Sequence, residues 1–473
     1  MNSAGYRYAA SDQAFYIPAI VRHLAPADFP RDAPLIDGQA RMTLVDEALA
    51  AVVQATGVSL QWLFAILYGV TLAVLFIALV RLGRRLYRSE WTVIALTAAL
   101  TLRHSIAKTG ANTLEGYFHP RVLVFGFGLL GVAAFLERRD WLWIALVALG
   151  IAIHPTTAVW FGVWLAIAAW FGRPSWRPAL AGVAGTAALA VVAMVWRGPF
   201  AGHLAPMDAE WLSAISDKDY LFPFEWPLSA WLLNLLTVPV ILSCWRARRR
   251  SNVAVPGETP LVLGALGLLV LFLCWLPFDA AHIALAVELQ VSRVFWLLDV
   301  FATIYVVWWL TEDAADTARR TRRAVVLAVL MVLSVARGSY SMFVEFPDRP
   351  IVDVDLKAGD WRDAMAWART TDASSGWLAD PIHAARYGSS VRAAAYRDVL
   401  LERVKDRAIA MYDRSAALRA ADRERALAAL SWDTPDGARA LARRYGLDYL
   451  IIDRALDLPL AHRSGALFIY RLR

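Results

Sequence analysis

The chain has 473 residues, of which 59% are hydrophobic, and a formal net charge of +7. Its apolar residues form long runs separated by short arginine-rich breaks, a composition typical of membrane proteins with many spans. Because the positive charge is divided among these breaks rather than gathered on one soluble face, nucleic acid is excluded as a partner. The two cysteines, Cys244 and Cys274, lie inside apolar runs, which excludes a disulfide framework or a thiolate metal site.

Residues 1–59 precede the first long apolar run and carry polar, aromatic and carboxylate side chains without a strong helix or strand period. No cleavable signal peptide opens the chain, because that run begins only near Leu60. Asp12 is the first candidate for a catalytic base in this segment, and Asp32 is a second one. The alternative for each is a charge in a solvated loop.

A bilayer core of about 30 Å needs about 20 apolar residues per helix. Ten segments meet or approach this length, and they are 60–80, 91–107, 121–136, 141–153, 155–171, 179–196, 227–245, 261–276, 291–310 and 324–343. Several are short, and the run 141–171 is interrupted only by His154-Pro155. Tilted, partial or re-entrant helices are therefore alternatives to full spans.

Lysine and arginine are unequally divided between alternate connections of these segments. One set of connections holds sixteen of them and the other set holds four. Cytoplasmic loops carry the excess of positive charge, so residues 1–59, the loops 103–120, 197–226 and 277–290, and the tail from 344 face outward. An outward tail is hard to translocate alone, so we expect either a further helix before residue 1 or a tail that crosses unaided.

Residues 344–473 are richer in charged residues and turn formers, and they are numerous enough for a soluble domain with its own core. The patterns predict helices over 360–369, 399–430 and 435–444, and strands over 377–380, 449–453 and 466–472. The predicted fold class is a polytopic α-helical membrane protein, spanning over 60–343, with a C-terminal soluble α/β domain.

Polar residues gather near the outward ends of the spans. The loop before residue 122 holds Arg103, His104, Lys108, Glu115, His119 and Arg121, with Pro120 as the first residue of a helix. Helix N-termini and cations bind phosphate, whereas cations that snorkel to headgroup level are the alternative. Arg293 and Asp299 enter a late span, where ionisable residues mark a functional site or a structural ion pair. His104, His119 and His154 lack metal-ligand spacing, so no metal ligands are assigned.

Four motifs resemble bacterial membrane proteins of the GT-C glycosyltransferase superfamily. They are Tyr8-x-x-x-Asp12-Gln13-x-x-Tyr16-x-Pro18, Phe29-x-x-Asp32, Glu115-x-x-x-His119-Pro120-Arg121 and His154-Pro155. The stretches 361–369, 380–381, 387–392 and 445–449 are similar to the outward soluble domains of that superfamily. The resemblance implies a transferase of a bacterial inner membrane that takes a sugar from a polyprenyl-phosphate carrier with inversion of the anomeric centre.

The resemblance also implies roles for single residues. Asp12 matches the catalytic base, with Asp32 in reserve, and Arg293 matches a phosphate-binding cation. Glu115 matches a second acidic motif that usually has two acidic residues, whereas Asn112 and Thr113 stand near it here. This departure favours no cofactor, with Mg²⁺ or Mn²⁺ as the alternative.

The expected partners are the lipid bilayer, a polyprenyl-phosphate-linked sugar and a glycan, lipid or protein acceptor. Two other functions stay open. A lipid-carrier flippase or transporter would favour paired broken helices and internal symmetry, and neither is clear in the sequence. An inactive scaffold of the same fold would bind partners through its soluble domain. No P-loop or dinucleotide fingerprint occurs, so a nucleotide-dependent cytoplasmic site is not expected.

Overall fold

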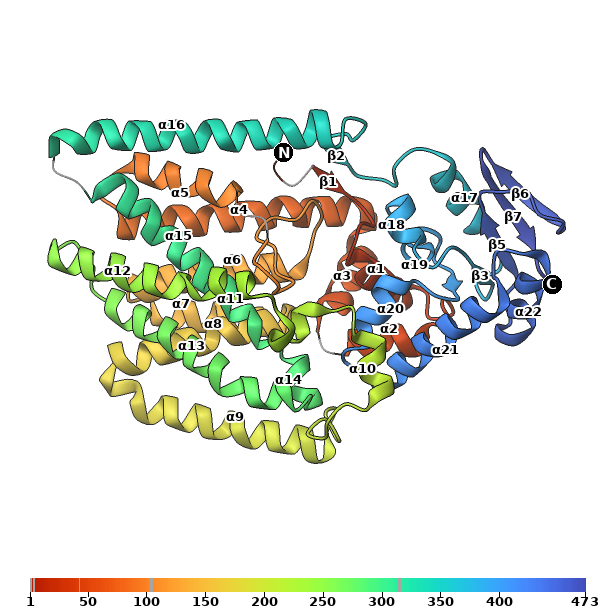
Figure 1. Cartoon of the computed structure of the whole chain (residues 1–473), viewed down its shortest axis with the longest axis horizontal. Helices are drawn as coiled ribbons and strands as arrows, with labels where there is room; N and C mark the ends of the chain where they lie inside the picture. The colour runs from red at the N-terminus through yellow and green to blue at the C-terminus, as the bar shows by residue number, and fades with distance from the viewer. Residues whose placement is uncertain (1, 3–4, 42, 103–104, 314–315) are drawn as a thin grey trace.

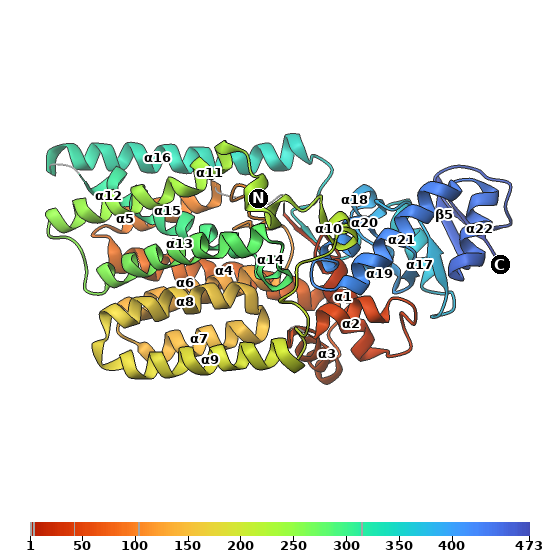
Figure 2. The same ribbon diagram turned by 60° about the horizontal axis from the view of Figure 1, so that its bottom comes forward.

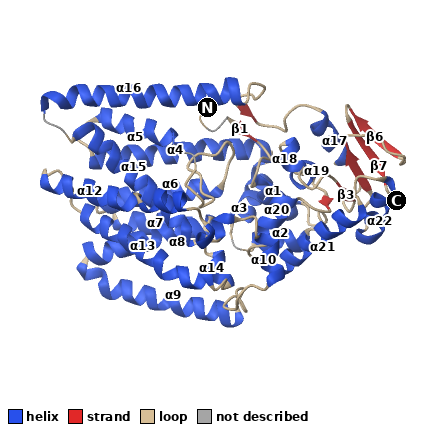
Figure 3. Cartoon of the chain, viewed as in Figure 1, coloured by secondary structure: helices blue, strands red, loops and turns tan. Residues whose placement is uncertain are grey.

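The computed structural model describes residues 2, 5–41, 43–102, 105–313 and 316–473, with backbone alone for residues 39 and 316–319. Figure 1 shows a bundle of long helices at one end of the molecule and a mixed α/β unit at the other. The view in Figure 2 shows the same division, and Figure 3 shows the larger sheet at the far end of the α/β unit. The two parts meet over short helices and loops.

The bundle contains eleven α-helices among the described residues. They are α4 (Leu60–Leu86), α5 (Glu90–Leu102), α6 (Pro120–Leu136), α7 (Asp140–Ile153), α8 (Pro155–Gly172), α9 (Arg177–Arg197), α11 (Leu228–Leu235), α12 (Thr237–Arg250), α13 (Glu258–Ala280), α15 (Val294–Glu312) and α16 (Asp316–Tyr340). Each apolar segment expected from the sequence overlaps one of these helices or the consecutive pair α11 and α12, but the segment expected over 91–107 is helical only to Leu102, and residues 105–107 are not helical. Within the described residues, seven helical stretches are long and apolar enough to cross a membrane, and α5, α6 and α7 are shorter apolar helices. The chain is therefore a helical membrane protein.

Helix α15 lies at the centre of the bundle. Its Trp296 is fully buried and stacks on Phe125 of α6, with 3.8 Å between the ring centroids. Gly128 of α6 lets Phe161 of α8 approach closely, because a Cβ at that position would lie 2.2 Å from the ring. Helix α9, in contrast, has no buried residue. Most of its surface is therefore left for lipid, although Leu180 packs against the core of the bundle.

The α/β unit holds a five-stranded sheet in the order β4-β3-β5-β7-β6. Its strands are β3 (Gly376–Leu378), β4 (Asp398–Val399), β5 (Tyr449–Ile452), β6 (Leu460–Ser464) and β7 (Leu467–Arg471). Strands β4, β3 and β5 pair in parallel, whereas β7 runs antiparallel to β5 and β6 antiparallel to β7. The predicted strands over 377–380, 449–453 and 466–472 are confirmed as β3, β5 and β7.

Six helices flank this sheet, and they are α17 (Asp360–Ala368), α18 (His383–Tyr387), α19 (Val391–Ala395), α20 (Arg403–Ile409), α21 (Arg414–Leu430) and α22 (Pro435–Tyr445). The predicted helices over 360–369 and 435–444 are confirmed as α17 and α22. The predicted helix over 399–430 is instead divided into α20 and α21. The division lies at Asp413, whose carboxylate accepts a hydrogen bond from the Ser415 amide and caps α21.

The predicted separation of residues 1–59 as an outer loop is wrong in one respect, because this segment folds onto the α/β unit. It forms β1 (Tyr6–Arg7), α1 (Gln13–Leu24), α2 (Ala33–Ala40) and α3 (Val45–Thr56). Strand β1 pairs in parallel with β2 (Val352–Asp353). Gly5 permits this pairing, because its φ is 79° and a Cβ would lie 2.4 Å from the Ile351 carbonyl oxygen. Pro18 lies inside α1, and a proline within a helix weakens the helical pattern, which explains why no helix was expected there.

Candidate active site

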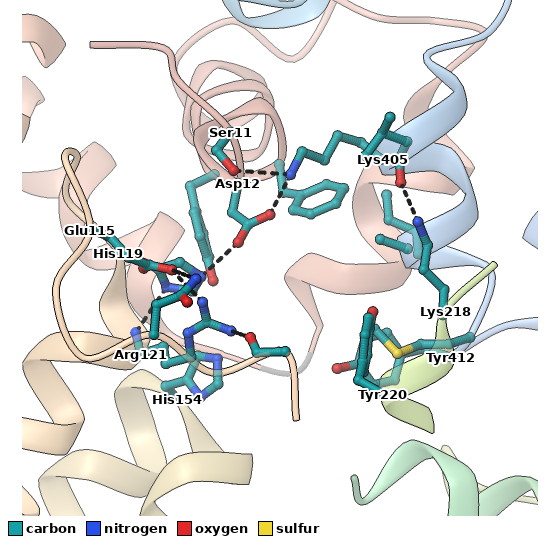
Figure 4. A pocket seen from close by; sticks show the side chains of 18 of the residues that line it. Ser11, Asp12, Glu115, His119, Arg121, His154, Lys218, Tyr220, Lys405 and Tyr412 are labelled. Carbon is teal, nitrogen blue, oxygen red and sulfur yellow. Dashed lines mark hydrogen bonds and ion pairs between the residues drawn. The ribbon is translucent and has the colours of Figure 1, made fainter. Parts of the chain in front are cut away.

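A polar cavity of about 270 Å³ lies where the bundle meets the α/β unit. Its walls come from the start of α1, the loop before α6, the loop between α9 and α11, the residues around α15's start, and α20 (Figure 4). The charged and histidine side chains that line it are Asp12, Glu115, His119, Arg121, His154, Lys218, Arg293 and Lys405. Four of these are lysine or arginine and two are carboxylates. The cavity is therefore suited to an anionic ligand.

Asp12 lies between His119 on one side of the cavity and Lys405 on the other (Figure 4). Its Oδ2 accepts a hydrogen bond from His119 Nε2 at 3.0 Å, and its Oδ1 accepts one from Lys405 Nζ at 2.5 Å. The Tyr117 hydroxyl donates to Oδ2 at 3.4 Å. Although Asp12 precedes α1, its side chain does not cap that helix. Both carboxylate oxygens are thus available to the cavity.

The turn before α1 holds Asp12 in this position. Ala9 and Ser11 have φ values of 57° and 49°, a left-handed conformation that is costly for residues with a Cβ. Gln13 is fully buried and donates from Nε2 to the Phe118 carbonyl at 3.1 Å, which ties the turn to the loop before α6. The strain is thus held in place by buried packing and places a carboxylate in the cavity.

His119 is the N-cap of α6, and Pro120 occupies the first helical position. Its Nδ1 accepts a hydrogen bond from the Arg121 amide at 3.1 Å. Because Nδ1 is an acceptor, the ring proton resides on Nε2, which donates it to Asp12. The His-Pro-Arg sequence therefore fixes both the orientation and the tautomer of the ring.

The electrostatic surroundings keep Asp12 ionised. Burial alone would raise the pKa of its carboxyl group, but Lys405, His119 and Arg121 together hold that pKa well below its usual value. An ionised carboxylate that is paired with an ammonium group has a low proton affinity and is therefore a weak base. It becomes a stronger base when the ammonium moves to another anion.

Glu115 forms an ion pair with Arg121. The guanidinium donates from Nη2 to Glu115 Oε1 and from Nη1 to the Gly110 carbonyl at 3.0 Å. Both side chains are less than a tenth exposed. The structure brings Glu115 to the cavity as predicted, but in a buried ion pair that positions a cation rather than as a free base.

Arg293 enters the cavity from the bundle side, just before α15. Its Nη1 donates to the Thr156 hydroxyl at 3.3 Å, and its Nε is buried without a hydrogen-bond partner. Among the described residues no carboxylate lies within ion-pairing distance of this guanidinium. The predicted alternative of an Arg293–Asp299 ion pair is not found among those residues. Arg293 is thus a buried cation with room for an anion.

His154 and the aromatic side chains complete the lining. The His154 ring lies 6.0 Å from the His119 ring, and its Nδ1 contacts the Thr156 hydroxyl at 3.2 Å. On the opposite wall are Tyr220 and Tyr412 (Figure 4), and Gln290 donates to the Tyr412 hydroxyl at 2.9 Å. Aromatic faces with hydroxyl groups are suited to the apolar face and hydroxyls of a sugar ring.

Sequence reasoning missed the contributions of Lys218, Tyr220, Lys405 and Tyr412 to the cavity. Neither lysine was a candidate from the sequence: Lys218 lies in the loop between α9 and α11, and Lys405 lies on α20. No local signal distinguishes Lys405 from its charged neighbours, because its role depends on a contact with a residue far away in the chain.

Asp32, the reserve candidate for the base, is not in this cavity. It is 1% exposed and accepts hydrogen bonds from Arg392 Nε at 2.5 Å and from the Val399 amide at 3.1 Å. Arg419 also pairs with it. Burial would raise its pKa, but Arg392, Arg419 and Arg423 lower it well below the usual value. These contacts leave no room for an acceptor, so the structure assigns Asp32 to a buried ion-pair cluster.

One predicted phosphate-binding residue of the loop before α6, Lys108, lies outside the cavity. Its ammonium group pairs with Asp219. Arg103 and His104 lie outside the described residues. Of the cations expected in this loop, the structure places Arg121 in the cavity together with His119.

The cavity does not fit a divalent metal such as Mg²⁺ or Mn²⁺. Its two carboxylates, Asp12 and Glu115, are each paired with a cation, and the remaining cations would repel a metal ion. Among the described residues, the one group with metal-like spacing is His23, Asp46 and Glu47 on α1 and α3, outside the cavity.

No protein-family model matches the chain, and no curated protein matches it.

Proposed function

We propose that the chain is an integral-membrane glycosyltransferase of the GT-C type, which moves a sugar from a polyprenyl-phosphate carrier to an acceptor with inversion. The observation that carries this proposal is the cavity at the end of the bundle. It combines one partly exposed carboxylate, Asp12, with a buried cation, Arg293, that has no ionic partner within the described part of the chain. A base and an anion site within one cavity match the two halves of the reaction.

The donor phosphate binds on the bundle side. Arg293 and Arg121 lie next to the apolar helices, so they receive a phosphate whose lipid tail stays among those helices. The bond from the anomeric carbon to the phosphate oxygen breaks, and the polyprenyl phosphate leaves as an anion. The two guanidinium groups stabilise the charge that develops on that oxygen.

The acceptor hydroxyl is deprotonated by Asp12. Lys405, only 12% exposed but on a long side chain, moves from Asp12 to the donor phosphate when that anion enters. Burial then raises the proton affinity of Asp12, which takes the hydroxyl proton as the new bond to the anomeric carbon forms. His119 keeps the carboxylate oriented through its Nε2–H.

The proposal extends to topology and location. The unequal division of lysine and arginine favours a cavity on the outer side of the membrane. The ten apolar segments are taken as spans, and the resemblance to the GT-C superfamily implies a bacterial inner membrane. The α/β unit, which supplies Lys405 and Tyr412, then shapes the acceptor side of the cavity. The acceptor is a glycan, a lipid or a protein, and the transfer assay identifies which of these classes it is.

The test is transfer of radiolabelled sugar from a panel of polyprenyl-phosphate sugars by the full-length protein in lipid nanodiscs. Asp12→Asn and Arg293→Gln each remove one half of the site, and we expect each to lower transfer at least about 100-fold. Asp363→Asn and Arg85→Gln are matched controls, because both residues are exposed and outside the cavity.

The assay also separates the rival functions. Transfer that survives Asp12→Asn overturns the assignment of the base. Wild-type protein that binds the carrier lipid and moves it between leaflets without transferring sugar is a flippase. Wild-type protein that binds a partner through the α/β unit and transfers no sugar from any donor is a scaffold.

A further inference from the structure

A second polar cavity, of about 160 Å³, lies between β1, the chain after α16 and helices α17 and α18. Figure 1 shows β1 and β2 at the end of α16. Four cations line this cavity, and they are Arg7, Arg349, Lys357 and Arg386. Its one carboxylate is Asp353. Its lining is therefore strongly positive and separate from that of the candidate active site.

Three of the four cations form no ion pair with any residue that the structure describes. Arg386 pairs with Asp380 and Asp453, but among the described residues no carboxylate lies within ion-pairing distance of Arg7, Arg349 or Lys357. Arg7 lies beside Asp353 in the β1–β2 pair without reaching it, and its Nε is buried without a hydrogen-bond partner. A buried guanidinium nitrogen without an acceptor is costly. An anion in the cavity would remove that cost.

The backbone holds these cations firmly. The Arg7 amide donates to the Gly116 carbonyl at 2.8 Å, and the Tyr8 amide donates to the Asp353 carbonyl at 3.2 Å. On the other wall, Trp361 stacks on Tyr387 with 4.4 Å between the ring centroids. Trp361 also donates from its indole N–H to the Ser389 hydroxyl at 3.1 Å. The cavity is thus preformed rather than assembled by a ligand.

Apolar side chains next to the cavity point to a ligand with a lipid tail. The last membrane-crossing stretch ends at Glu345, four residues before Arg349. Phe343, Val344 and Ile351 are each more than half exposed. Cations that immediately follow a span, beside exposed apolar side chains, lie at the headgroup level of a bilayer.

We propose that this second cavity binds a phosphate group, and that its source is the headgroup of an anionic membrane phospholipid. Arg7, Arg349 and Lys357 bind the phosphate oxygens, and Phe343 and Ile351 contact the acyl chains. The proposal is independent of the transferase activity. A lipid held here fixes the α/β unit against the bilayer next to the candidate active site, because Arg7 and Ser11 are only four residues apart.

The experiment is a native mass-spectrometric titration of the full-length protein, purified in a neutral detergent, with dioleoylphosphatidylglycerol. The Arg7→Gln/Arg349→Gln double variant removes two cations. Each cation near a headgroup changes affinity by about fivefold, so we expect the tightest lipid to bind about 25-fold more weakly. Arg425→Gln is the control, since this exposed arginine pairs with Glu210 and lies outside the cavity. Lys357→Gln, at an exposed side chain, gives an expected fivefold loss without disturbing buried backbone contacts.

A second arm titrates inorganic phosphate against the same proteins. Lipid binding that falls in the cavity variants, with weak competition by inorganic phosphate, supports the lipid source. Phosphate binding that falls in those variants while lipid binding does not change supports the phosphate site and overturns the lipid source. Equal binding of both probes to wild type, the double variant and Lys357→Gln overturns the proposal.

Discussion

Asp12 and Asp32 are two carboxylates of the same N-terminal segment, and each accepts hydrogen bonds from cations of the α/β unit. Asp32 is 1% exposed and is surrounded by Arg392, Arg419 and Arg423. Asp12 is 24% exposed and faces an open cavity with Lys405 on one side. The sequence offers both as candidates, and packing distinguishes them. A carboxylate whose oxygens are all held by rigid cations is structural, whereas one with space beside it is available for chemistry.

The difference also concerns which partners are able to move. Arg392 is itself fixed, because it pairs with Asp406 as well as Asp32 and is buried. Among the described residues, the Lys405 ammonium forms an ion pair with Asp12 alone, contacts the Ser11 hydroxyl and lies over the ring of Phe15. Its single charged contact allows it to exchange Asp12 for a ligand. The comparison therefore predicts that Asp12 controls activity and Asp32 controls stability.

The largest expected effect is on activity in Asp12→Asn. Asparagine keeps the size of the side chain but removes the base, and loss of a general base lowers a rate about 100-fold to 10,000-fold. The free energy of unfolding changes by about 1 kcal/mol or less, since the side chain is partly exposed. Sugar transfer and thermal unfolding, measured on the same preparation, test the predicted loss of activity and the predicted small change in stability. Full activity with a large loss of stability would reverse the assignments of Asp12 and Asp32.

The next effect is on stability in Asp32→Asn. The substitution leaves Arg392 and Arg419 buried without their shared anion, and breaking a buried ion pair costs about 3–5 kcal/mol. Thermal unfolding followed by tryptophan fluorescence measures the change. Asp436→Asn is the control, because its side chain is fully exposed, and we expect a change within about 0.5 kcal/mol. An Asp32→Asn protein as stable as wild type would contradict the structural role.

The helical membrane character of residues 60–343 could be predicted from the sequence, because the length of an apolar run is a local property. The His119-Pro120-Arg121 stretch could also be predicted as a helix start with a polar function, since capping depends on neighbouring residues. The pairing of Asp12 with Lys405 could not be predicted. It joins residues 393 positions apart and depends on how the N-terminal segment packs on the α/β unit.

Dependence on distant residues also explains why Asp32 was expected to be a candidate base. Its sequence context resembles that of a functional carboxylate, and nothing local shows that Arg392 and Arg419 approach it. Strands β4 and β6 were missed because one is two residues long and the other is a partly exposed edge strand. The residue types of a candidate site can therefore be predicted from this sequence. Whether a carboxylate faces a cavity, as Asp12 does, or is enclosed by cations, as Asp32 is, depends on tertiary contacts.

A third prediction concerns Glu402, which links the two regions. It is buried beside Asp406 of the Asp32 cluster and begins the helix that carries Lys405. Burial and the Asp406 charge raise its pKa to about 8. Because the folded-state pKa lies above that of the unfolded chain, the carboxyl group lowers stability as the pH rises from its usual pKa towards 8, by about 1.4 kcal/mol per pH unit.

Glu402→Gln replaces this group with a neutral side chain of similar shape. We expect the stability of the variant relative to wild type to increase from pH 6 to pH 8 and then to level off. Unfolding measurements at pH 6, 7, 8 and 9 give this difference directly. Stability curves of the two proteins that run parallel across this range would show that Glu402 is ionised in the folded protein.

The smallest expected effect is that of Lys405→Met, and it tests whether the ammonium group tunes Asp12. Lys405 is the strongest of the neighbouring groups that lower the Asp12 pKa, so its removal lets burial raise that pKa. Since the base must be ionised, the acid limb of the pH profile of kcat/KM moves to higher pH. At pH 7 the rate falls about tenfold, the effect of losing one charge-assisted hydrogen bond to the donor phosphate. Arg403→Gln, on the same helix but paired with Glu424, leaves the profile unchanged. If the acid limb stays in place in Lys405→Met, Lys405 binds ligand without setting the pKa of Asp12. The pKa of Asp12 would then depend on His119 rather than on Lys405.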